Sequence, residues 1–388
     1  GKNMKTSSKL AILSISLLTI MSSAAISPAL SSIQDHFYNV DVRYIKMIIT
    51  LPALFIIPIT LLTGKLVLIF RKKTLLITGA ILYVIGGVSG AFANTIWVLL
   101  AFRSVMGIGV GLLLPLARGL IADFFNGEER SQMMGFATSF NNLGGIISLI
   151  IAGFLSVYSW RYPFFIYLLG FVVIYMVIKY LPDQEIKEKT TTKVEVNKNV
   201  WLLGFGMFYM MQMFYAVPTF LSIYIDEVNL GTTFTTGILI AITTLGSLLF
   251  GMFFQKVRFK LKGLTPIVGL SFITLGMYII AAVLNIYVIG FAMLIIGFGL
   301  GIVSPMLYLL STTESKPKDT TFALALMSSF SFFGQFSSPF VLELMQNIFN
   351  NNEPNSAFLL SSYIGVIGIV GVLINKKVRV YKENNINH

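Results

Sequence analysis

Long apolar runs, separated by short polar stretches, recur along the whole chain. An α-helix needs about 20 mostly apolar residues to cross the hydrocarbon core of a bilayer. Twelve runs meet this requirement, at residues 10–32, 45–69, 74–93, 96–121, 133–158, 164–180, 200–225, 235–254, 265–284, 286–312, 321–349 and 356–374. The pattern predicts an all-α membrane protein with twelve transmembrane helices.

One polar connector is much longer than the others. It runs from Pro182 to Asn199, between the sixth and seventh predicted spans. Polar segments of this kind commonly join domains. We therefore predict two six-helix bundles, residues 1–181 and 200–388, joined by a cytoplasmic linker at 182–199.

The two predicted bundles share a sequence pattern. Residues 107–115, GIGVGLLLP, are matched by residues 297–305, GFGLGIVSP, and we call the shift from Gly107 to Gly297 the repeat offset. The same offset relates Ser-Phe-x-x-x-Gly at 139–144 to Ser-Phe-x-x-x-Gly at 329–334. Two patterns that repeat at the same offset predict that the chain contains a duplicated unit. Parallel six-span repeats are an architecture of secondary transporters.

The composition supports a membrane protein. Charged residues make up 11% of the chain, hydrophobic residues make up 56%, and the mean hydropathy is +0.82. Soluble globular proteins contain roughly 25% charged residues. A soluble fold of this size could not cover its surface with so few charges, so much of this surface must face lipid.

Several kinds of chemical site are missing from the sequence. There is no cysteine, which excludes disulfides and thiolate metal sites. His36 and His388 have no second ligand at metal-binding spacing. A phosphate-binding Gly-x-x-x-x-Gly-Lys-Ser/Thr loop does not occur either. We expect a protein that is not an enzyme and binds no cofactor or metal, and any transport must draw on an ion gradient.

The net charge of +12 is distributed asymmetrically. Only Arg43, Lys46 and Arg161 fall on one side of the predicted spans. The opposite side carries the main basic clusters: Lys2, Lys5 and Lys9; Arg71, Lys72 and Lys73; Lys256, Arg258, Lys260 and Lys262; Lys376, Lys377, Arg379 and Lys382. By the positive-inside rule both termini are cytoplasmic. This distribution predicts a multi-pass protein of the cell membrane whose partner is the lipid bilayer and not nucleic acid.

Arg103 is the clearest functional candidate within a span. An ionisable side chain there costs a few kcal/mol on insertion scales. Arg103 shares a helical stripe with Gly107, Gly111 and Arg118, and this stripe must face protein or water. We predict that Arg103 takes part in proton coupling and that Arg118 lines a substrate cavity. The alternatives are a permanent pairing of Arg103 with a neighbouring helix and snorkelling of Arg118 to the interface.

Glu343 is the one carboxylate well inside a predicted span, and we take it as the second candidate for proton coupling. Its alternative is an interfacial position at the end of the eleventh span. Neutral polar residues in the spans are candidates to line the substrate cavity: Asn141, Asn142, Gln212, Tyr215 and Gln335. Helix–helix hydrogen bonding is the alternative role for these residues.

These residues and motifs resemble the major facilitator superfamily across essentially the whole chain. Residues 64–73, GKLVLIFRKK, are similar to the loop that the family conserves between its second and third spans. The usual Asp and Gly of this loop are replaced by Leu68 and Arg71. The segment around Arg103 resembles the arginine motif of drug:proton antiporters. The antiporter motif of the fifth span lacks its Gly-Pro core, and a proline stands instead at Pro339, which the repeat offset pairs with Leu149.

The resemblance implies a major facilitator fold, in which two pseudo-symmetric six-helix bundles rock around a midplane cavity. It also implies a gating loop made of Gly64, Arg71, Lys72, Asp123 and Arg130. The family's usual loop after the fourth span is matched by Asp123 and Arg130, whereas Leu68 stands where the family has the Asp that helps to lock its inward gate.

Three functions are compatible with these features. The first is a monomeric secondary transporter that exports small amphipathic molecules, such as drugs or metabolites, in exchange for protons. The second is an exporter or importer of an anionic metabolite or metal-chelating acid, because guanidinium groups pair well with anions. The third is a transport-inactive sensor or lipid-handling protein on the same fold, for which the altered loop around Leu68 is the only support.

Overall fold

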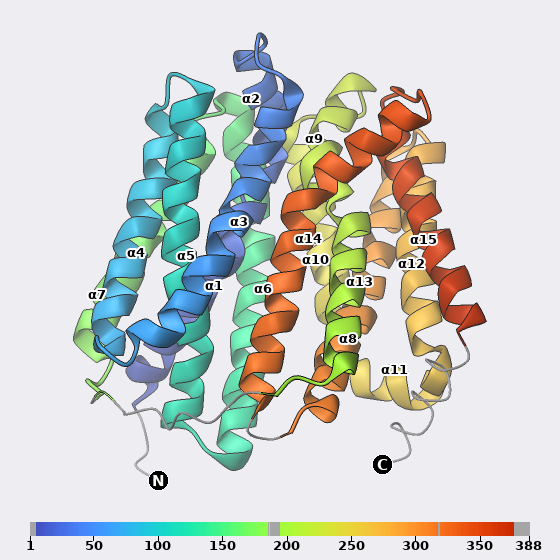
Figure 1. Cartoon of the computed structure of the whole chain (residues 1–388). Helices are drawn as coiled ribbons and strands as arrows, with labels where there is room; N and C mark the ends of the chain where they lie inside the picture. The colour runs from blue at the N-terminus through green and yellow to red at the C-terminus, as the bar shows by residue number, and fades with distance from the viewer. Residues whose placement is uncertain (1–4, 185, 187–194, 317–318, 376–388) are drawn as a thin grey trace. The chain divides into compact units, whose positions relative to one another are not determined.

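The computed structural model describes residues 5–184, 186, 195–316 and 319–375. All ordered elements in these residues are helices, and the chain divides into two compact units, Gly1–Thr192 and Lys193–His388 (Figure 1). Part of the predicted linker at 182–199 lies outside the described residues, as do residues 1–4 and 376–388. The bundle boundaries at 181 and 200 and the cytoplasmic side of the termini therefore stay predictions.

The first unit contains six long helical stretches. Its elements are α1 (Thr6–Ala24), η1 (Ser27–Ala29), α2 (Leu30–His36), α3 (Val42–Leu66), α4 (Lys72–Val88), η2 (Ser89–Phe92), α5 (Ile96–Phe124), α6 (Gly127–Tyr158), η3 (Tyr162–Leu168) and α7 (Leu169–Tyr180). Within this unit α5 packs on both α3 and α4, α1 packs on α6, and α4 packs on α7.

The second unit repeats this arrangement. Its elements are α8 (Lys198–Phe214), α9 (Ala216–Glu227), α10 (Thr233–Met252), α11 (Phe254–Leu261), η4 (Lys262–Leu264), α12 (Thr265–Ala282), α13 (Ile286–Glu314), α14 (Thr320–Ile348) and α15 (Ser356–Ile374). Here α13 packs on α10 and α12, α8 packs on α14, and α12 packs on α15. Each pairing has its counterpart in the first unit, which agrees with the duplication inferred from the sequence.

The glycine patterns explain how the central helix of each unit approaches its neighbours. A Cβ atom on Gly107 would lie 2.6 Å from the Pro52 carbonyl oxygen of α3, and one on Gly109 would lie 2.6 Å from the Gly79 carbonyl oxygen of α4. In the second unit a Cβ atom on Gly297 would lie closer still to the Thr243 carbonyl oxygen of α10. Glycine therefore allows backbone-to-backbone packing at these crossings, as small residues do in membrane helix pairs.

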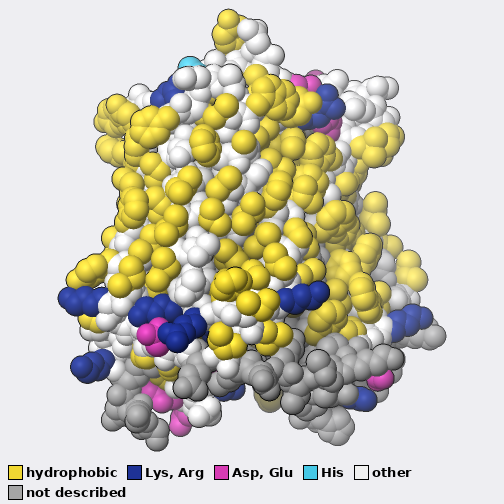
Figure 2. Space-filling model, turned by 60° about the vertical axis from the view of Figure 1, so that its left-hand side comes forward, with side chains coloured by type: hydrophobic (Ala, Val, Ile, Leu, Met, Phe, Trp, Pro, Cys, Tyr) yellow, Lys and Arg dark blue, Asp and Glu magenta, His cyan; other side chains and the backbone are white. Residues whose placement is uncertain are grey.

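Eleven helical stretches in the described residues are long and apolar enough to cross a membrane. They coincide with eleven of the twelve predicted spans. The remaining one, predicted at 321–349, forms α14, which has 29 residues but is less apolar than the other eleven because of its serine and amide side chains. On the face drawn in Figure 2, hydrophobic side chains form a broad band, and the Lys and Arg side chains lie towards its edges. This pattern is expected where lipid covers the band.

Candidate functional site

The first helical stretch of the first unit is broken. Helix α1 ends at Ala24, and a turn and η1 lead into α2. Carbonyl groups in the last turn of a helix leave the regular hydrogen-bond ladder, and those of Met21 and Ser22 lie in this turn. Nearby, α3 contains Pro52, which has no N–H, so the Ile48 carbonyl loses its helical donor. The unit therefore has several backbone acceptors to satisfy away from water.

Arg103 supplies donors to this cluster of acceptors. Its side chain is fully buried. Its Nη2 donates to the Ser22 carbonyl at 2.5 Å, its Nε donates to the Ile48 carbonyl at 2.8 Å, and its Nη1 donates to the Tyr167 hydroxyl at 3.0 Å. The Tyr167 hydroxyl lies 3.1 Å from the carbonyl oxygens of both Met21 and Ser22. We call Arg103, Tyr167 and these three carbonyl groups the arginine clamp.

The arginine clamp joins three elements of the first unit, namely α1, α3 and η3, to α5. None of the hydrogen-bond partners of Arg103 is a carboxylate among the residues that the structure describes. Tyr83 packs edge-on against Tyr167, with ring centroids 5.4 Å apart. The Tyr83 hydroxyl is buried without a hydrogen-bond partner among the described residues. A buried unsatisfied hydroxyl is costly, so a shift of the clamp that satisfied it would be favourable.

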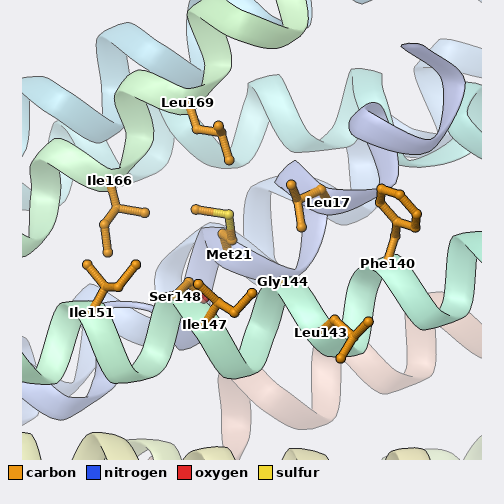
Figure 3. A pocket seen from close by; sticks show the side chains of 10 residues that line it. All are labelled: Leu17, Met21, Phe140, Leu143, Gly144, Ile147, Ser148, Ile151, Ile166 and Leu169. Carbon is orange, nitrogen blue, oxygen red and sulfur yellow. The ribbon is translucent and has the colours of Figure 1, made fainter. Parts of the chain in front are cut away.

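An apolar cavity of about 480 Å³ adjoins the clamp (Figure 3). Its lining comes from α1, α6, η3 and α7: Leu17, Met21, Phe140, Leu143, Gly144, Ile147, Ser148, Ile151, Ile166 and Leu169. In Figure 3 the side chains of Ile151 and Ile166 face each other, and the end of the Met21 side chain points toward Ile166. Ser148 is the polar exception in the lining, and its hydroxyl donates to the Gly145 carbonyl of its own helix at 3.0 Å. A cavity of this size accommodates a drug-sized apolar ligand.

Met21 connects the clamp and the cavity. Its side chain lines the cavity, and its carbonyl is within hydrogen-bond distance of Tyr167. The next residue, Ser22, accepts the shortest bond from Arg103. A movement of the α1 break would therefore alter both the hydrogen bonds of the guanidinium group and one wall of the cavity.

Aromatic rings pack together in the equivalent region of the second unit. The repeat offset places Phe333 at the position of Leu143, and Phe333 stacks on Phe208 at 5.6 Å. Phe330 packs against Trp201 at 5.9 Å, and its ring lies over Gly204. Of the equivalent first-unit residues, Leu143 and Leu18 are aliphatic, whereas Phe140, which lines the cavity, is aromatic like Phe330.

The predicted cavity residues differ in their burial. Arg118 is exposed on α5, and Gln335 and Asn142 are half-buried. Asn141 is half-buried too, and its Oδ1 has no hydrogen-bond partner in the described part of the chain. In the second unit Gln212 is buried and Tyr215 lies at the break between α8 and α9.

Some of these side chains already bond within their own unit. The amide nitrogen of Gln212 donates to the Ser337 hydroxyl at 2.6 Å, and the amide nitrogen of Gln335 lies 3.4 Å from the Ser331 hydroxyl. Glu343 is half-buried near the end of α14, which stops at Ile348. The helix–helix alternative therefore describes Gln212 well, whereas the roles of the others stay predictions.

Three of the predicted gating residues come together at the start of α4 and the end of α5. Lys72 forms an ion pair with Asp123. Arg130 donates to the carbonyl groups of Ala122 and Phe125 at 2.6 and 2.8 Å, on either side of Asp123. Gly64 and Arg71 are exposed nearby in sequence. The α3–α4 loop is thus fastened to α5 through Lys72.

Sequence reasoning missed the partners of Arg103 and the cavity lining. Tyr167 was not singled out, although a tyrosine within an apolar span normally bonds its hydroxyl to a buried acceptor. Pro52 was also a usable signal, since a proline inside a predicted helix frees a carbonyl group. The cavity residues gave no signal, because aliphatic side chains on α6 look the same whether they pack or leave a gap.

Known proteins resemble this chain over most of its length. The family described as Major Facilitator Superfamily matches residues 12–339. Quinolone resistance protein NorA of Staphylococcus aureus is 26% identical over 341 residues, which cover 81% of this chain and 83% of that protein. Niacin transporter NiaP of Acinetobacter baylyi is 28% identical over 173 residues, covering 44% of this chain and 36% of that protein.

Other relatives match over shorter segments. Multidrug resistance protein 3 of Bacillus subtilis is 30% identical over 122 residues, covering 31% of this chain and 24% of that protein. Apart from NorA, the similarity to these curated relatives therefore spans under half of their length.

Solved transporters share the fold. A D-xylose–proton symporter superposes with a TM-score of 0.75 at 16% identity, over 94% of this chain and 96% of that chain. A bacterial homologue of the human lysosomal transporter Spinster superposes with a TM-score of 0.72 at 15% identity, over 100% of this chain and 98% of that chain. Together with the family match across residues 12–339, these similarities show that the chain belongs to the Major Facilitator Superfamily of multi-pass membrane transporters.

Proposed function

We propose that the protein is a twelve-span, proton-coupled exporter of small amphipathic molecules, with an apolar part of its cargo held in the cavity beside the arginine clamp. The cavity is the observation that carries the proposal, because its lining is almost wholly apolar. Such a surface binds by burial of apolar area and not by matched charges. The names of NorA and of Multidrug resistance protein 3 support the same cargo class.

The burial of Arg103 argues against an anionic cargo at this position. Each of its donor nitrogens already bonds to a backbone carbonyl or to Tyr167 or Met106. An anion would have to displace those bonds and leave the carbonyl groups unsatisfied, which is costly in an apolar surrounding. Arg118 is exposed, so it is the position at which an anionic cargo would bind if there is one. The name of the niacin transporter NiaP keeps this second candidate open.

The proposed coupling of proton movement to transport gives Arg103 and Glu343 different roles. Arg103 stays charged at all physiological pH values, so it positions the α1 break and does not itself carry the proton. Glu343 is the proposed carrier, since it is a half-buried carboxyl group within a long helix. The two bundles would then alternate access by rocking, as in other transporters built from parallel repeats. The protein would act as a monomer in the cell membrane, with both termini in the cytoplasm.

Transport in proteoliposomes tests this proposal. Three dyes of similar size, one cationic, one neutral and one an aromatic carboxylate, would be followed with and without an imposed pH gradient. We expect gradient-dependent movement of the cationic and neutral dyes. Transport of the carboxylate alone, lost in Arg118→Gln, would favour the anionic cargo. No movement of any dye with retained binding would favour a sensor or lipid-handling role, and movement that ignores the gradient would remove proton coupling.

Two variants test the cargo site and the proton carrier separately. Ile147→Trp adds a larger side chain to the cavity and should weaken dye binding by about tenfold, whereas Phe154→Trp on the same helix lies outside the lining and should not. Glu343→Gln should retain dye binding and lose the response to the gradient. If Ile147→Trp binds dye normally, the cavity is not the cargo site.

A further inference from the structure

A short basic helix lies between the second and third long helical stretches of the second unit. Helix α11 runs across the ends of its neighbours and continues into η4 (Figure 1). Lys256, Arg258 and Lys260 lie on α11, and Lys262 begins η4. The segment 253–264 contains no Asp or Glu. None of the four cations forms an ion pair with a described residue of this chain.

One face of α11 is anchored and the other is open. Phe254 is buried against Met306 and Leu310 of α13. By contrast, Phe253, just before α11, and Phe259 are 49% and 78% exposed, and Lys256 lies 5.7 Å from the ring centre of Phe253. A helix with exposed aromatic rings among lysines is suited to the interface between lipid headgroups and acyl chains.

Comparison with the first unit shows that Lys262 lacks a carboxylate partner among the described residues. There Lys72, at the start of α4, pairs with Asp123 near the end of α5. The repeat offset places Lys262 at the position of Lys72 and Thr313 at the position of Asp123. The second unit thus keeps the lysine and lacks the carboxylate. The neighbouring Glu314 does not replace it, because its carboxylate accepts from Asn197 and Asn199, at the start of α8.

A small cleft lies at this point. Arg258 and Lys262 stand at its side, with Thr265 and Pro266, and its apolar wall is formed by Met306, Leu309 and Leu310 of α13. This hollow has room for about one water, so a lipid phosphate would lie at its mouth between Arg258 and Lys262, with the acyl chains beside the exposed rings of Phe253 and Phe259. A soluble anion would use the charges and leave the exposed rings unused.

We propose that α11 and η4 form a binding site for the headgroup of an anionic phospholipid, whose phosphate takes the place of the carboxylate that Asp123 supplies in the first unit. Arg258 and Lys262 bind the phosphate, and Phe253 and Phe259 enter the interface beside it. The lipid fastens the α10–α12 connection to the end of α13. The site is separate from the cargo cavity, so it stands whether or not the proposed transport is found.

Native mass spectrometry of the purified protein measures this binding. Phosphatidylglycerol and phosphatidylcholine would be titrated, and we expect a clear preference for the anionic lipid. The double variant Arg258→Gln/Lys262→Gln should weaken phosphatidylglycerol binding by about tenfold or more, because each basic residue near an anionic surface contributes appreciably. The matched control Lys65→Gln/Lys198→Gln removes the same charge from exposed positions elsewhere and should change binding less than about twofold.

The repeat comparison supplies a second test. Thr313→Asp restores a carboxylate opposite Lys262 and should displace the lipid, whereas Thr313→Asn should not. If the double variant fails to fold, the charge-keeping variant Arg258→Lys/Lys262→Arg should fold and bind. Equal losses in the double variant and its control would reduce the effect to general surface charge and overturn the proposal. Competition by inorganic phosphate at the same concentration as the lipid would overturn the lipid assignment in favour of a free anion.

Discussion

Both units begin with a broken helix, and the two breaks are satisfied by different chemistry. Pro28 and Pro218 follow the breaks and are related by the repeat offset. In the first unit the Ser22 carbonyl before the break accepts from the guanidinium group of Arg103. In the second unit the equivalent Gln212 carbonyl accepts from the Ser338 hydroxyl at 2.9 Å. The same backbone geometry is held by a charged donor in one unit and a neutral donor in the other.

The contrast recurs at other equivalent places. The start of α4 is held by the Lys72–Asp123 ion pair, whereas Lys262 corresponds to Lys72 and Thr313 to Asp123 in the second unit. Arg103 itself is replaced by Met293. Neutral hydrogen bonds do not change with the protonation of nearby groups, whereas a buried charge responds to every charge around it. The difference teaches that a buried charge holds the helix break in the first unit, whereas a neutral hydrogen bond holds it in the second.

The largest effect should come from Arg103→Ala. The change leaves the Ser22 and Ile48 carbonyls and the Tyr167 hydroxyl without their donors in an apolar surrounding. We expect a loss of about 3 kcal/mol or more in the free energy of unfolding, and loss of gradient-driven transport by the protein that remains folded. Thermal unfolding in detergent and transport per folded molecule would be measured together.

Arg103→Lys sharpens this test, because lysine keeps the charge but cannot reach both carbonyls as a fork. It should recover part of the stability and part of the transport. Met293→Ala at the equivalent position removes only apolar contacts and should leave gradient dependence intact. A stable and fully active Arg103→Ala protein would break the comparison between the two units.

The second effect concerns the glycine crossings, which should be alike in the two units. Gly107→Ala places a Cβ atom 2.6 Å from the Pro52 carbonyl oxygen, and Gly297→Ala places one even closer to the Thr243 carbonyl oxygen. Both contacts are with backbone atoms, which cannot move away easily. Each change should therefore lower the free energy of unfolding by about 1–3 kcal/mol, with the larger loss for Gly297→Ala. Gly119→Ala is the control, since nothing lies within 4 Å of its Cβ position. If all three variants unfold at the same temperature, the close approach of the helices does not depend on glycine.

The spans and the repeat were readable from the sequence because both depend on composition and spacing. Apolar runs of about 20 residues predicted eleven spans that the structure bears out, and the repeated glycine patterns fall where helices cross closely. The sequence also singled out Arg103 as a costly buried charge. It could not show that the partners are carbonyl groups of Ser22 and Ile48, because every residue carries a carbonyl and only a break or a proline frees one.

The cavity lay beyond the reach of sequence reasoning for a different reason. Whether Leu143 and Ile147 leave a space depends on what stands opposite them in three dimensions. The two repeats differ at one of these positions, because Phe333 stands in the second unit where Leu143 stands in the first, and it stacks on Phe208. Residue volume compared across the repeat offset would not have located the cavity, because Leu143 is smaller than Phe333 whereas Ile147 and Ile166 are larger than the equivalent Ser337 and Ser356.

A smaller effect is expected where the neutral donor of the second unit is removed. Ser338→Ala leaves the Gln212 carbonyl without the side-chain donor and should cost about 1 kcal/mol. Ser148→Ala, at the equivalent position of the first unit, removes only a bond within one turn of α6 and should cost less. The unfolding temperatures of the two variants show which of them loses more stability. A larger loss for Ser148→Ala would mean that the second break is held by packing and not by this hydrogen bond.

The smallest effect is a pH dependence confined to the first unit. Asp41 caps α3 by accepting from the Arg43 amide at 2.9 Å, and its carboxylate also receives the Arg43 guanidinium group. The side-chain hydrogen bond from Arg43, helped by the backbone one, lowers the pKa of Asp41 below its ordinary value of 3.8. A carboxyl group with a lowered pKa in the folded state contributes stability above its unfolded pKa, and this contribution is lost as the pH falls through the folded value.

The equivalent helix of the second unit, α10, is capped without a charge, because the Thr232 amide donates to the Thr235 hydroxyl at 3.1 Å. Hydrogen exchange in the first turn of α3 should therefore quicken as the pH is lowered below about 4, after correction for intrinsic exchange, while that of α10 should not. Asp41→Asn should remove the pH dependence and keep most of the cap, since asparagine is also a good N-cap residue. Because Asp41 is well exposed, the change in overall stability should be slight. An equal response of α10 would show that the acid effect is global and not a property of the charged cap.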